Sequence, residues 1–451
     1  MTATKQKPSA AVIVGLGRTG LSAARYLHAR GWRIAVTDTR AQPPELERLR
    51  ELDPNVPVRL GGLDTQLLDD ALCVVASPGV SLAEPFFVEA RRRGLEIVGD
   101  VELFALAVDA PVAGITGTNG KSTVTTLLGR MAERAGVKVR VGGNLGEPAL
   151  DLLSASQEDA PRTELYVLEL SSYQLEATLS LDLKAAAVLN VTPDHLDRYS
   201  SVEGYAAAKA RIFARCDTAV INLDDPLVVA MPRPGQHTLS FSLRASIGAD
   251  YAVAEKDGWW LTRQGEPLLP VSAMKMAGLH NAANALAALA LGEALGFPLP
   301  AMLTELASFP GLPHRSEWVA EVNGVRYVND SKGTNVGATL AAVNGMSGPL
   351  ILIAGGDGKN QDFAPLRAAF KGKVRHVVLI GRDAPAIERV LAGICTTGRA
   401  ASLEEAVRAA ARAAQSGDTV LLSPACASLD MFRDYAHRGA VFVQAVKELA
   451  A

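Results

Sequence analysis

One ten-residue segment, from Gly114 to Thr123, constrains the fold of this chain more than any other. It has the sequence GITGTNGKST. The apolar run at 111–115 predicts a buried strand before it, and apolar residues at helical spacing over 124–135 predict a helix after it. A strand, a glycine-rich loop and a helix in this order direct unpaired N–H groups and the positive end of a helix dipole at one point. The segment therefore predicts an anion site in an α/β fold.

The side chains of this segment suit a nucleoside triphosphate. Lys121 supplies a mobile positive charge, and Ser122 offers a hydroxyl to a magnesium ion carried by the phosphates. The strict Walker pattern has a glycine where this chain has Ile115, but the Gly-Lys-Ser-Thr core is intact. The alternative is a glycine turn that carries Lys121 on the protein surface. The expected phosphate-binding residues are Gly117, Thr118, Asn119, Gly120, Lys121, Ser122 and Thr123.

A second glycine-rich junction lies near the start of the chain. A strand at 10–14, the glycines of 15–20, a helix at 21–30 and a strand at 33–37 that ends at Asp38 form a dinucleotide fingerprint. By itself this pattern suggests NAD, but uridine diphosphate would fit the same backbone, and a Rossmann-like fold without a ligand is a third possibility. A further strand at 74–76 leads into Ser77-Pro78-Gly79, at the sheet edge where such folds bind ligands.

Two polar residues are expected at strand ends beside the phosphate loop. Glu169 lies in the strand at 166–170, and a carboxylate there is costly to bury unless it meets a cation; the alternative is an exposed glutamate on an edge strand. His195 follows the strand at 185–190, where a metal ligand or a hydrogen-bond donor to the transition state would lie. Lys209, in an alanine-rich helix over 202–213, is expected from spacing to be a surface lysine.

The C-terminal half predicts a second parallel sheet. A helix begins at His280, and Asn281 and Asn284 either cap it or contact a base, capping being favoured by their position. The prolines of 308–313 mark a boundary. A hairpin over 318–328 and strands at 350–353, 377–380 and 419–422 follow, and most of these strands lead into polar loops. Together these patterns predict three α/β domains: a Rossmann-like domain at 1–100, a central P-loop domain at 101–310 and a Rossmann-like domain at 311–451.

Composition narrows the class of protein. With a formal net charge of -3 over 451 residues, the chain lacks the overall basic surface that neutralises nucleic-acid phosphates. Its four cysteines form no Cys-x-x-Cys pair, which argues against a zinc ribbon or a disulfide scaffold. The first residues are unlike a signal sequence, and no run of about 20 apolar residues is present. We expect a cytoplasmic protein with neither a nucleic-acid nor a membrane partner.

Six motifs in this order resemble the Mur ligases, a family of ATP-dependent amide ligases. They are Gly117-Thr-Asn-Gly-Lys-Ser-Thr123, Glu169-Leu-Ser-Ser, Asn190-Val-Thr-Pro-Asp-His195, His280-Asn-Ala-Ala-Asn284, His314-Arg315 and Asn329-Asp-Ser-Lys332. Within the family, the dinucleotide-like start and the run from Leu422 to Asp430 are most similar to the branch that adds D-glutamate. Gly333, Met431 and Tyr435 depart from the commoner pattern, which has alanine, glutamine and phenylalanine there.

The resemblance implies a cytoplasmic step of peptidoglycan synthesis. ATP would phosphorylate the carboxylate of UDP-N-acetylmuramoyl-L-alanine, and the amine of D-glutamate would attack the acyl phosphate. Two magnesium ions are implied, one held by Ser122 and Glu169 and one served by His195 and Lys209. Lys209 matches the carbamylated lysine of the family, which reverses the expectation from spacing. We expect a monomer.

The resemblance also implies roles for residues outside the phosphate loop. Lys121, Glu169, His195 and Lys209 would be catalytic, and the nucleotide would contact Asn284, Arg315 and Asp330. The UDP-sugar would be bound by Arg18, Thr19, Asp38, Thr39, Arg40, Ser77, Gly79 and Asn144. D-Glutamate would be bound by Thr334, Lys359, Ser428 and Tyr435.

Three other functions compete with this one. A nicotinamide oxidoreductase would leave the phosphate loop without a role, and a P-loop switch or motor would leave the first domain without one. Another Mur ligase, which adds L-alanine, a diamino acid or a dipeptide, would keep both sites and change only the amino-acid pocket.

Overall fold

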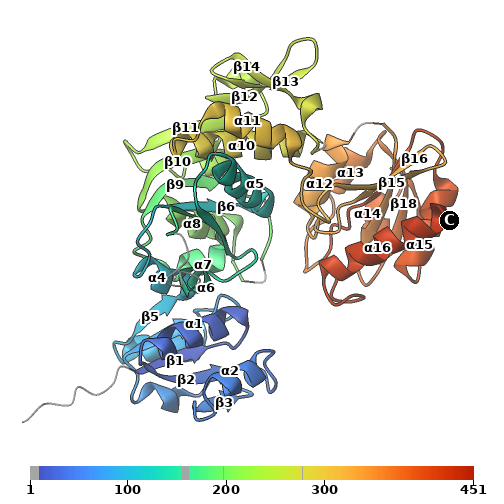
Figure 1. The fold of residues 1–451 in the computed structure, drawn as a ribbon. Coiled ribbons are helices and arrows are strands. Elements are labelled where there is room, and N and C mark those ends of the chain that lie inside the picture. The colour runs from blue at the N-terminus through green and yellow to red at the C-terminus, as the bar shows by residue number, and fades with distance from the viewer. Residues whose placement is uncertain (1–9, 155–161, 197, 277, 347, 451) are drawn as a thin grey trace, which may run out of the picture.

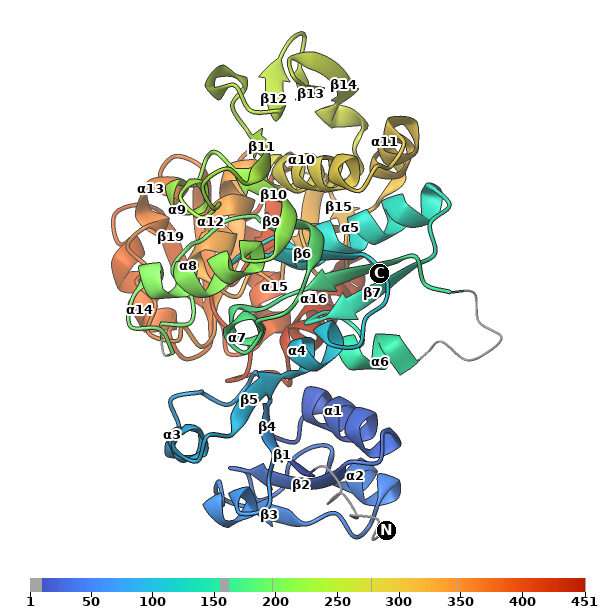
Figure 2. The ribbon, with the colours of Figure 1, turned by 90° about the vertical axis from the view of Figure 1, so that its left-hand side faces the viewer.

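The computed structural model describes residues 10–154, 162–196, 198–276, 278–346 and 348–450. The first nine residues, expected not to be a signal sequence, lie outside this range. Three β-sheets, built in turn by successive parts of the chain, organise the fold (Figures 1 and 2). This arrangement confirms the predicted α/β class.

The first sheet is fully parallel and has the strand order β3-β2-β1-β4-β5. Alternate residues of its central strand face opposite sides, so that Ile13 packs in the core that includes helix α1 and Val12 in the core that includes helix α3. The predicted strands are confirmed. The elements are β1 (Ala10–Val14), α1 (Arg18–Ala29), β2 (Arg33–Asp38), α2 (Leu46–Leu52), β3 (Val58–Leu60), β4 (Cys73–Ala76), α3 (Pro85–Arg92) and β5 (Glu96–Gly99).

The second sheet has nine strands in the order β14-β13-β12-β11-β10-β9-β6-β8-β7. Strands β6 to β12 pair in parallel, whereas β12, β13 and β14 pair antiparallel. The elements are α4 (Asp100–Ala105), β6 (Val112–Thr116), α5 (Lys121–Arg134), β7 (Val139–Gly143), α6 (Ala149–Ser154), β8 (Leu165–Glu169), α7 (Ser172–Glu176), β9 (Leu183–Val188), α8 (Val202–Ala210), β10 (Cys216–Asn222), α9 (Pro226–Val229), β11 (His237–Ser242), β12 (Tyr251–Glu255), β13 (Trp259–Arg263), β14 (Glu266–Pro270), α10 (Leu279–Ala294) and α11 (Leu299–Ser308).

The prediction that asparagines cap helix α10 is wrong. The N-cap of α10 is Gly278, and neither Asn281 nor Asn284 caps the helix; instead Asn284 Nδ2 donates to Asn281 Oδ1 at 3.1 Å. Both asparagines lie inside the first two turns, past the position where a side chain reaches the free N–H groups.

The third sheet has the order β15-β16-β20-β17-β18-β19 and is parallel except for the predicted hairpin of β15 and β16. Strands β16, β20 and β17 are neighbours, so the loops after them meet at one edge. The elements are β15 (Glu317–Val322), β16 (Val325–Asn329), α12 (Val336–Gly345), β17 (Leu350–Gly355), α13 (Leu366–Phe370), β18 (Val374–Ile380), α14 (Ala384–Leu391), β19 (Thr396–Arg399), α15 (Leu403–Ala413), β20 (Thr419–Leu422) and α16 (Tyr435–Ala450).

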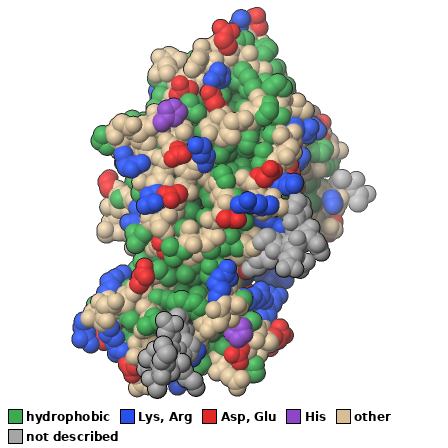
Figure 3. Space-filling model, turned by 60° about the vertical axis from the view of Figure 1, so that its left-hand side comes forward, with side chains coloured by type: hydrophobic (Ala, Val, Ile, Leu, Met, Phe, Trp, Pro, Cys, Tyr) green, Lys and Arg blue, Asp and Glu red, His purple; other side chains and the backbone are tan. Residues whose placement is uncertain are grey.

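Charged side chains of both signs are interspersed on the face drawn in Figure 3. Among the helices that the structure describes, none is both long and apolar enough to cross a lipid bilayer.

Candidate functional site

The phosphate loop has the predicted strand-loop-helix form. Strand β6 ends at Thr116 and helix α5 begins at Lys121, whose Nζ donates to the carbonyl oxygens of Gly117 and Thr118, at 2.8 Å each. Gly120 has a φ of +86°, and a Cβ there would lie 2.3 Å from Asn284 Oδ1. Only glycine fits this position. The side chain of Lys121 is partly exposed but folds back onto the loop, and burial of its ammonium group lowers its pKa.

Glu169 ends strand β8, which lies between β6 and β7, so the edge-strand alternative is excluded. Its residue is 3% exposed, and Asn144 Nδ2 donates to Oε1 at 2.9 Å. The buried Oε2 has no hydrogen-bond partner among the described residues. A buried carboxylate oxygen without a donor suits a cation, and the nearby hydroxyl of Ser122 is a second oxygen of the kind that magnesium prefers.

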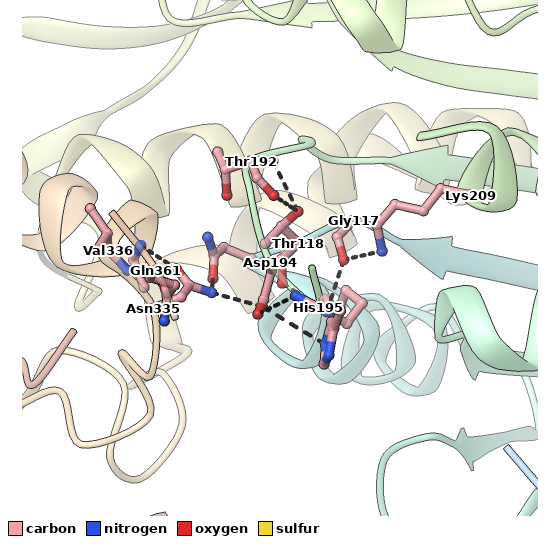
Figure 4. A network of polar contacts seen from close by, with 12 residues as sticks. Gly117, Thr118, Thr192, Asp194, His195, Lys209, Asn335, Val336 and Gln361 are labelled. Carbon is pink, nitrogen blue, oxygen red and sulfur yellow. Dashed lines mark hydrogen bonds and ion pairs between the residues drawn. The ribbon is translucent and has the colours of Figure 1, made fainter. Parts of the chain in front are cut away.

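Lys209 is buried, with 1% exposure, and the expectation of a surface lysine is wrong. Helix α8 packs it beside the phosphate loop, where its Nζ donates to Gly117 O at 2.9 Å and lies 4.3 Å from the centre of the Tyr205 ring (Figure 4). Burial, and then the charge of Lys121, lower the pKa of Lys209 well below its ordinary value. Two lysine side chains therefore share one carbonyl oxygen, that of Gly117.

His195 lies in the loop after strand β9, at the same edge of the sheet. Its φ of +56° turns the backbone sharply, and its ring meets that of Tyr173 edge to face at 5.1 Å. His195 Nε2 lies 3.8 Å from Asp194 Oδ2. The described residues contain no cluster of three or more His, Cys, Asp or Glu side chains able to hold a metal ion. A magnesium ion here would take the rest of its oxygen ligands from phosphates and water.

Polar contacts join the third part of the chain to the phosphate loop and to the loop after β9, among them a hydrogen bond from Asn335 Nδ2 to Asn119 Oδ1 at 3.4 Å. Arg315 Nη2 donates to Ser122 Oγ at 2.8 Å. Asn335 Nδ2 donates to Asp194 Oδ2 at 3.1 Å (Figure 4). Asn335 also caps helix α12, because its Oδ1 accepts from Ala338 N at 2.8 Å. The N-terminus of α12 is thus held against the loop that carries His195.

A cavity of about 270 Å³ opens beside the phosphate loop between the second and third parts of the chain. Asp330 lies in its wall, where it accepts from Ser316 N at 3.1 Å and from Ser423 Oγ at 2.8 Å, and burial raises the pKa of its carboxyl to about 6. Apolar side chains, among them Phe241 and Leu243, line another part of the wall. The predicted nucleotide residues brought together here are Asn119, Gly120, Thr123, Asn284, Arg315 and Asp330.

A second cavity, of about 510 Å³, lies between the first sheet and the loop after β7. The Asp38 carboxylate accepts hydrogen bonds from Leu16 N and from Arg40. Burial is the largest single influence on the pKa of this carboxyl and raises it, but the hydrogen bonds and the charge of Arg40 together hold the pKa below its usual range. All eight residues predicted for the UDP-sugar line this one cavity: Arg18, Thr19, Asp38, Thr39, Arg40, Ser77, Gly79 and Asn144. Asn144, which lines this cavity, also donates to Glu169, so the cavity wall is hydrogen-bonded to one of the magnesium candidates.

The four residues predicted for D-glutamate follow three strand ends at one edge of the third sheet, three of them on loops and Tyr435 at the start of helix α16. Thr334 follows β16, Lys359 follows β17, and Ser428 and Tyr435 follow β20. The loops are joined by hydrogen bonds from Gly355 N to Pro424 O and from Ala425 N to Gly333 O. Adjacent loops could therefore form one pocket wall.

Sequence reasoning assigned no role to several residues at this edge, nor to Arg198, which donates to Pro78 O in the wall of the second cavity at 2.8 Å. Lys332 stacks on the Tyr435 ring at 3.7 Å, and burial lowers its pKa to about 8. Arg438 is fully buried and donates to oxygens of Ser331 and Cys426. Lys332 had a signal, since it lies in a dense polar loop after a strand. Arg438 and Arg198 had none, because a lone arginine is most often exposed.

Family models match three consecutive parts of the chain. They are described as "Mur ligase MurD-like, N-terminal domain" at 9–99, "Mur ligase middle domain" at 115–292 and "Mur ligase, glutamate ligase domain" at 314–426.

Curated relatives match almost end to end. The UDP-N-acetylmuramoylalanine--D-glutamate ligase of Nitrosococcus oceani is 54% identical over 447 residues, which is 98% of each chain. That of Methylococcus capsulatus is 51% identical over 443 residues, 98% of this chain and 95% of the relative.

Solved structures share the fold at low identity. A pseudomurein peptide ligase type C from Methanothermus fervidus has a TM-score of 0.62 at 18% identity, over 98% of this chain and all of that one. The MurF ligase of Thermotoga maritima, in complex with ADP, has a TM-score of 0.62 at 17% identity, over 99% and 96%. On these matches and the geometry above, the chain belongs to the Mur ligase family.

Proposed function

We propose that this protein is an ATP-dependent ligase that joins D-glutamate to UDP-N-acetylmuramoyl-L-alanine in the cytoplasmic stage of peptidoglycan synthesis. The observation that carries the proposal is the phosphate loop, which lines the smaller cavity, together with the Asn144–Glu169 hydrogen bond, which joins the wall of the larger cavity to strand β8 beside that loop. The relatives with matching full-length sequences bear the name of this activity. Both the oxidoreductase and the P-loop switch would leave one cavity without a role.

The reaction begins with a carboxylate, which is a poor electrophile until it carries a leaving group. We infer that the nucleotide lies in the cavity of about 270 Å³ and the UDP-sugar in that of about 510 Å³, so that the γ-phosphate and the substrate carboxylate meet at Gly117–Thr123. Lys121, released from the carbonyls that it now contacts, would neutralise charge on the transferred phosphoryl group. Arg315 would supply a second cation on the side of Ser122.

We propose that Ser122 and Glu169 hold one magnesium ion, as the free oxygen of Glu169 supports. When bound, the ion would neutralise phosphate charge. A second ion would be served by His195 and by a carbamate on Lys209. The Lys209 amine would attack carbon dioxide, forming a nitrogen–carbon bond and releasing a proton, so that an anion replaces one of two cations beside Gly117. The burial of Lys209 and the proximity of Lys121 support this change of charge.

The amine of D-glutamate would arrive from the third sheet. We propose that Thr334, Lys359, Ser428 and Tyr435 bind it, with Lys359 as counter-charge for a carboxylate. The amine would attack the acyl phosphate, form the amide and expel phosphate. The domain boundaries at 100 and 310 belong to the same proposal, since they separate the three sheets and allow closure around the substrates.

Phosphate release tests the proposed activity. The purified protein, with ATP, magnesium and UDP-N-acetylmuramoyl-L-alanine, should release phosphate only when D-glutamate is present. Release that instead depends on a diamino acid or a dipeptide would assign another Mur ligase activity, and equal release without an amine would favour a switch. Sedimentation of the same sample tests the expected monomer.

The carbamate has a separate test. Protein incubated with ¹³C-labelled bicarbonate should show a carbamate carbon signal that is absent from the Lys209→Arg variant. The same signal in both proteins would refute the assignment to Lys209.

A further inference from the structure

Arg198 lies between two groups of candidate residues and contacts both. Its Nη1 donates to Pro78 O at 2.8 Å, and its Nη2 donates to the Glu176 carboxylate at 2.8 Å. The centre of its guanidinium lies 4.0 Å from the centre of the Tyr173 ring, and the side chain is only 13% exposed. The planar guanidinium of Arg198 thus uses two edges for hydrogen bonds and one face for contact with an aromatic ring.

The first contact fixes the wall of the larger cavity. Pro78 lies between Ser77 and Gly79, and all three line the cavity of about 510 Å³. Ser77 Oγ donates to Gly15 O at 2.7 Å, which joins this wall to the glycine turn after β1. A ligand that displaces residues 77–79 would therefore also displace the Pro78 carbonyl to which the Arg198 guanidinium donates.

The other contacts reach His195. The Tyr173 ring, which Arg198 covers, is the one that meets the His195 ring at 5.1 Å. The backbone N–H of Arg198, which any residue at this position would supply, also donates to His195 O at 3.0 Å, within the turn that gives His195 its positive φ. The side chain of Arg198 thus holds a ring neighbour of His195.

We propose that Arg198 is a positioning residue that couples occupancy of the larger cavity to the placement of His195. A bound ligand sets the position of residues 77–79, and the hydrogen bond to Pro78 O makes the Arg198 guanidinium move with them. Through its contact with the Tyr173 ring, Arg198 in turn sets the positions of Tyr173 and His195. The identity of the ligand as a uridine diphosphate sugar rests on the proposed function; the coupling rests on the contacts. Lysine at 198 would keep the charge but has a single ammonium group, which cannot serve both edges and the ring.

The test uses UDP as the probe and His195 as the readout. UDP lacks the sugar acid that would extend toward the phosphate loop, so a change at His195 has to pass through the protein. In protein labelled with ¹⁵N at its seven histidines, the His195 ring signal is assigned by its loss in the His195→Gln variant. Each protein is titrated with UDP to saturation, and calorimetry on the same samples measures UDP affinity.

Arg211→Lys is the matched control. Arg211 donates to Leu175 O at 2.7 Å and to Thr178 O at 3.0 Å, so it binds the same segment around α7 from within the central part of the chain. Its replacement removes hydrogen bonds of the same kind from the same segment. Thermal unfolding of both variants checks that each is folded.

We expect UDP to shift the His195 signal in the wild type and in Arg211→Lys, and to shift it several-fold less in Arg198→Lys at saturation. UDP affinity should fall by about tenfold in Arg198→Lys alone, the effect of about 1.4 kcal/mol. An equal shift in Arg198→Lys, an equal loss in Arg211→Lys, or a wild type that shows no shift or no UDP binding would each overturn the proposal. A wild type without D-glutamate-dependent phosphate release would refute the proposed function, while the UDP titration would still decide the role of Arg198.

Discussion

Replacing Asp100 by asparagine should remove a measurable part of the pH dependence of stability. Asp100 is the first residue of helix α4 and is almost fully buried, and its Oδ2 accepts from Gln174 Nε2 at 3.2 Å. Burial raises the pKa of this carboxyl from 3.8 to about 6. No basic side chain is among the groups that favour its charged form.

The sign follows from proton binding. Between about pH 4 and pH 6 the folded chain holds a proton on Asp100 that the unfolded chain has released, so stability falls as the pH rises. The contribution is fully present below pH 3.8 and is lost as the pH passes through 6. At about 1.4 kcal/mol per pH unit, the loss amounts to about 3 kcal/mol.

Urea unfolding at several pH values between 4 and 7.5 measures the effect. The unfolding transition of the same part of the chain is compared in each protein. Asp100→Asn should lose less stability than the wild type over this range, by about 3 kcal/mol. Asp217→Asn is the control, because the Asp217 side chain is 66% exposed. Parallel curves for the wild type and Asp100→Asn would refute the reasoning.

Three further substitutions test other parts of the site. Lys209→Arg should abolish turnover while thermal unfolding changes little, because arginine forms no carbamate; retained activity would contradict the role. Gly120→Ala should lose nucleotide binding measured by calorimetry, since a Cβ would lie 2.3 Å from Asn284 Oδ1 at a φ of +86°, and unchanged affinity would show that the loop adapts. Arg438→Met should destabilise the protein to urea by about 3 kcal/mol, because buried oxygens of Ser331 and Cys426 lose charged donors; a change below about 1 kcal/mol would refute this.

The sequence predicted those parts of the structure in which one local pattern dominates. The phosphate loop and the turn after β1 were found because glycines separate a strand from a helix in both places. Strand ends were displaced by one or two residues, because pairing with the neighbouring strand decides where a strand ends and no local pattern records it. The strand predicted at 185–190, for example, is β9 (Leu183–Val188).

The remaining differences between prediction and structure concern residues whose burial the sequence does not reveal. Helix α8 is rich in alanine and has little amphipathic pattern, so nothing in its spacing marks Lys209 as an inward residue. The resemblance to a family implied a role for Lys209 at a metal site, and in the structure its Nζ donates to Gly117 O at 2.9 Å. Arg198 and Arg438 gave no signal for a related reason: their partners are mostly backbone carbonyls of distant loops, and such contacts exist only once the chain has folded.

The transfer of an oxygen atom tests the central claim that ATP activates the substrate acid. UDP-N-acetylmuramoyl-L-alanine labelled with ¹⁸O in its terminal carboxylate is converted in the presence of ATP and D-glutamate, and the released phosphate is analysed by mass spectrometry. An acyl phosphate requires that each phosphate carry one oxygen atom from that carboxylate. Phosphate without the label, released in step with amide formation, would contradict the account.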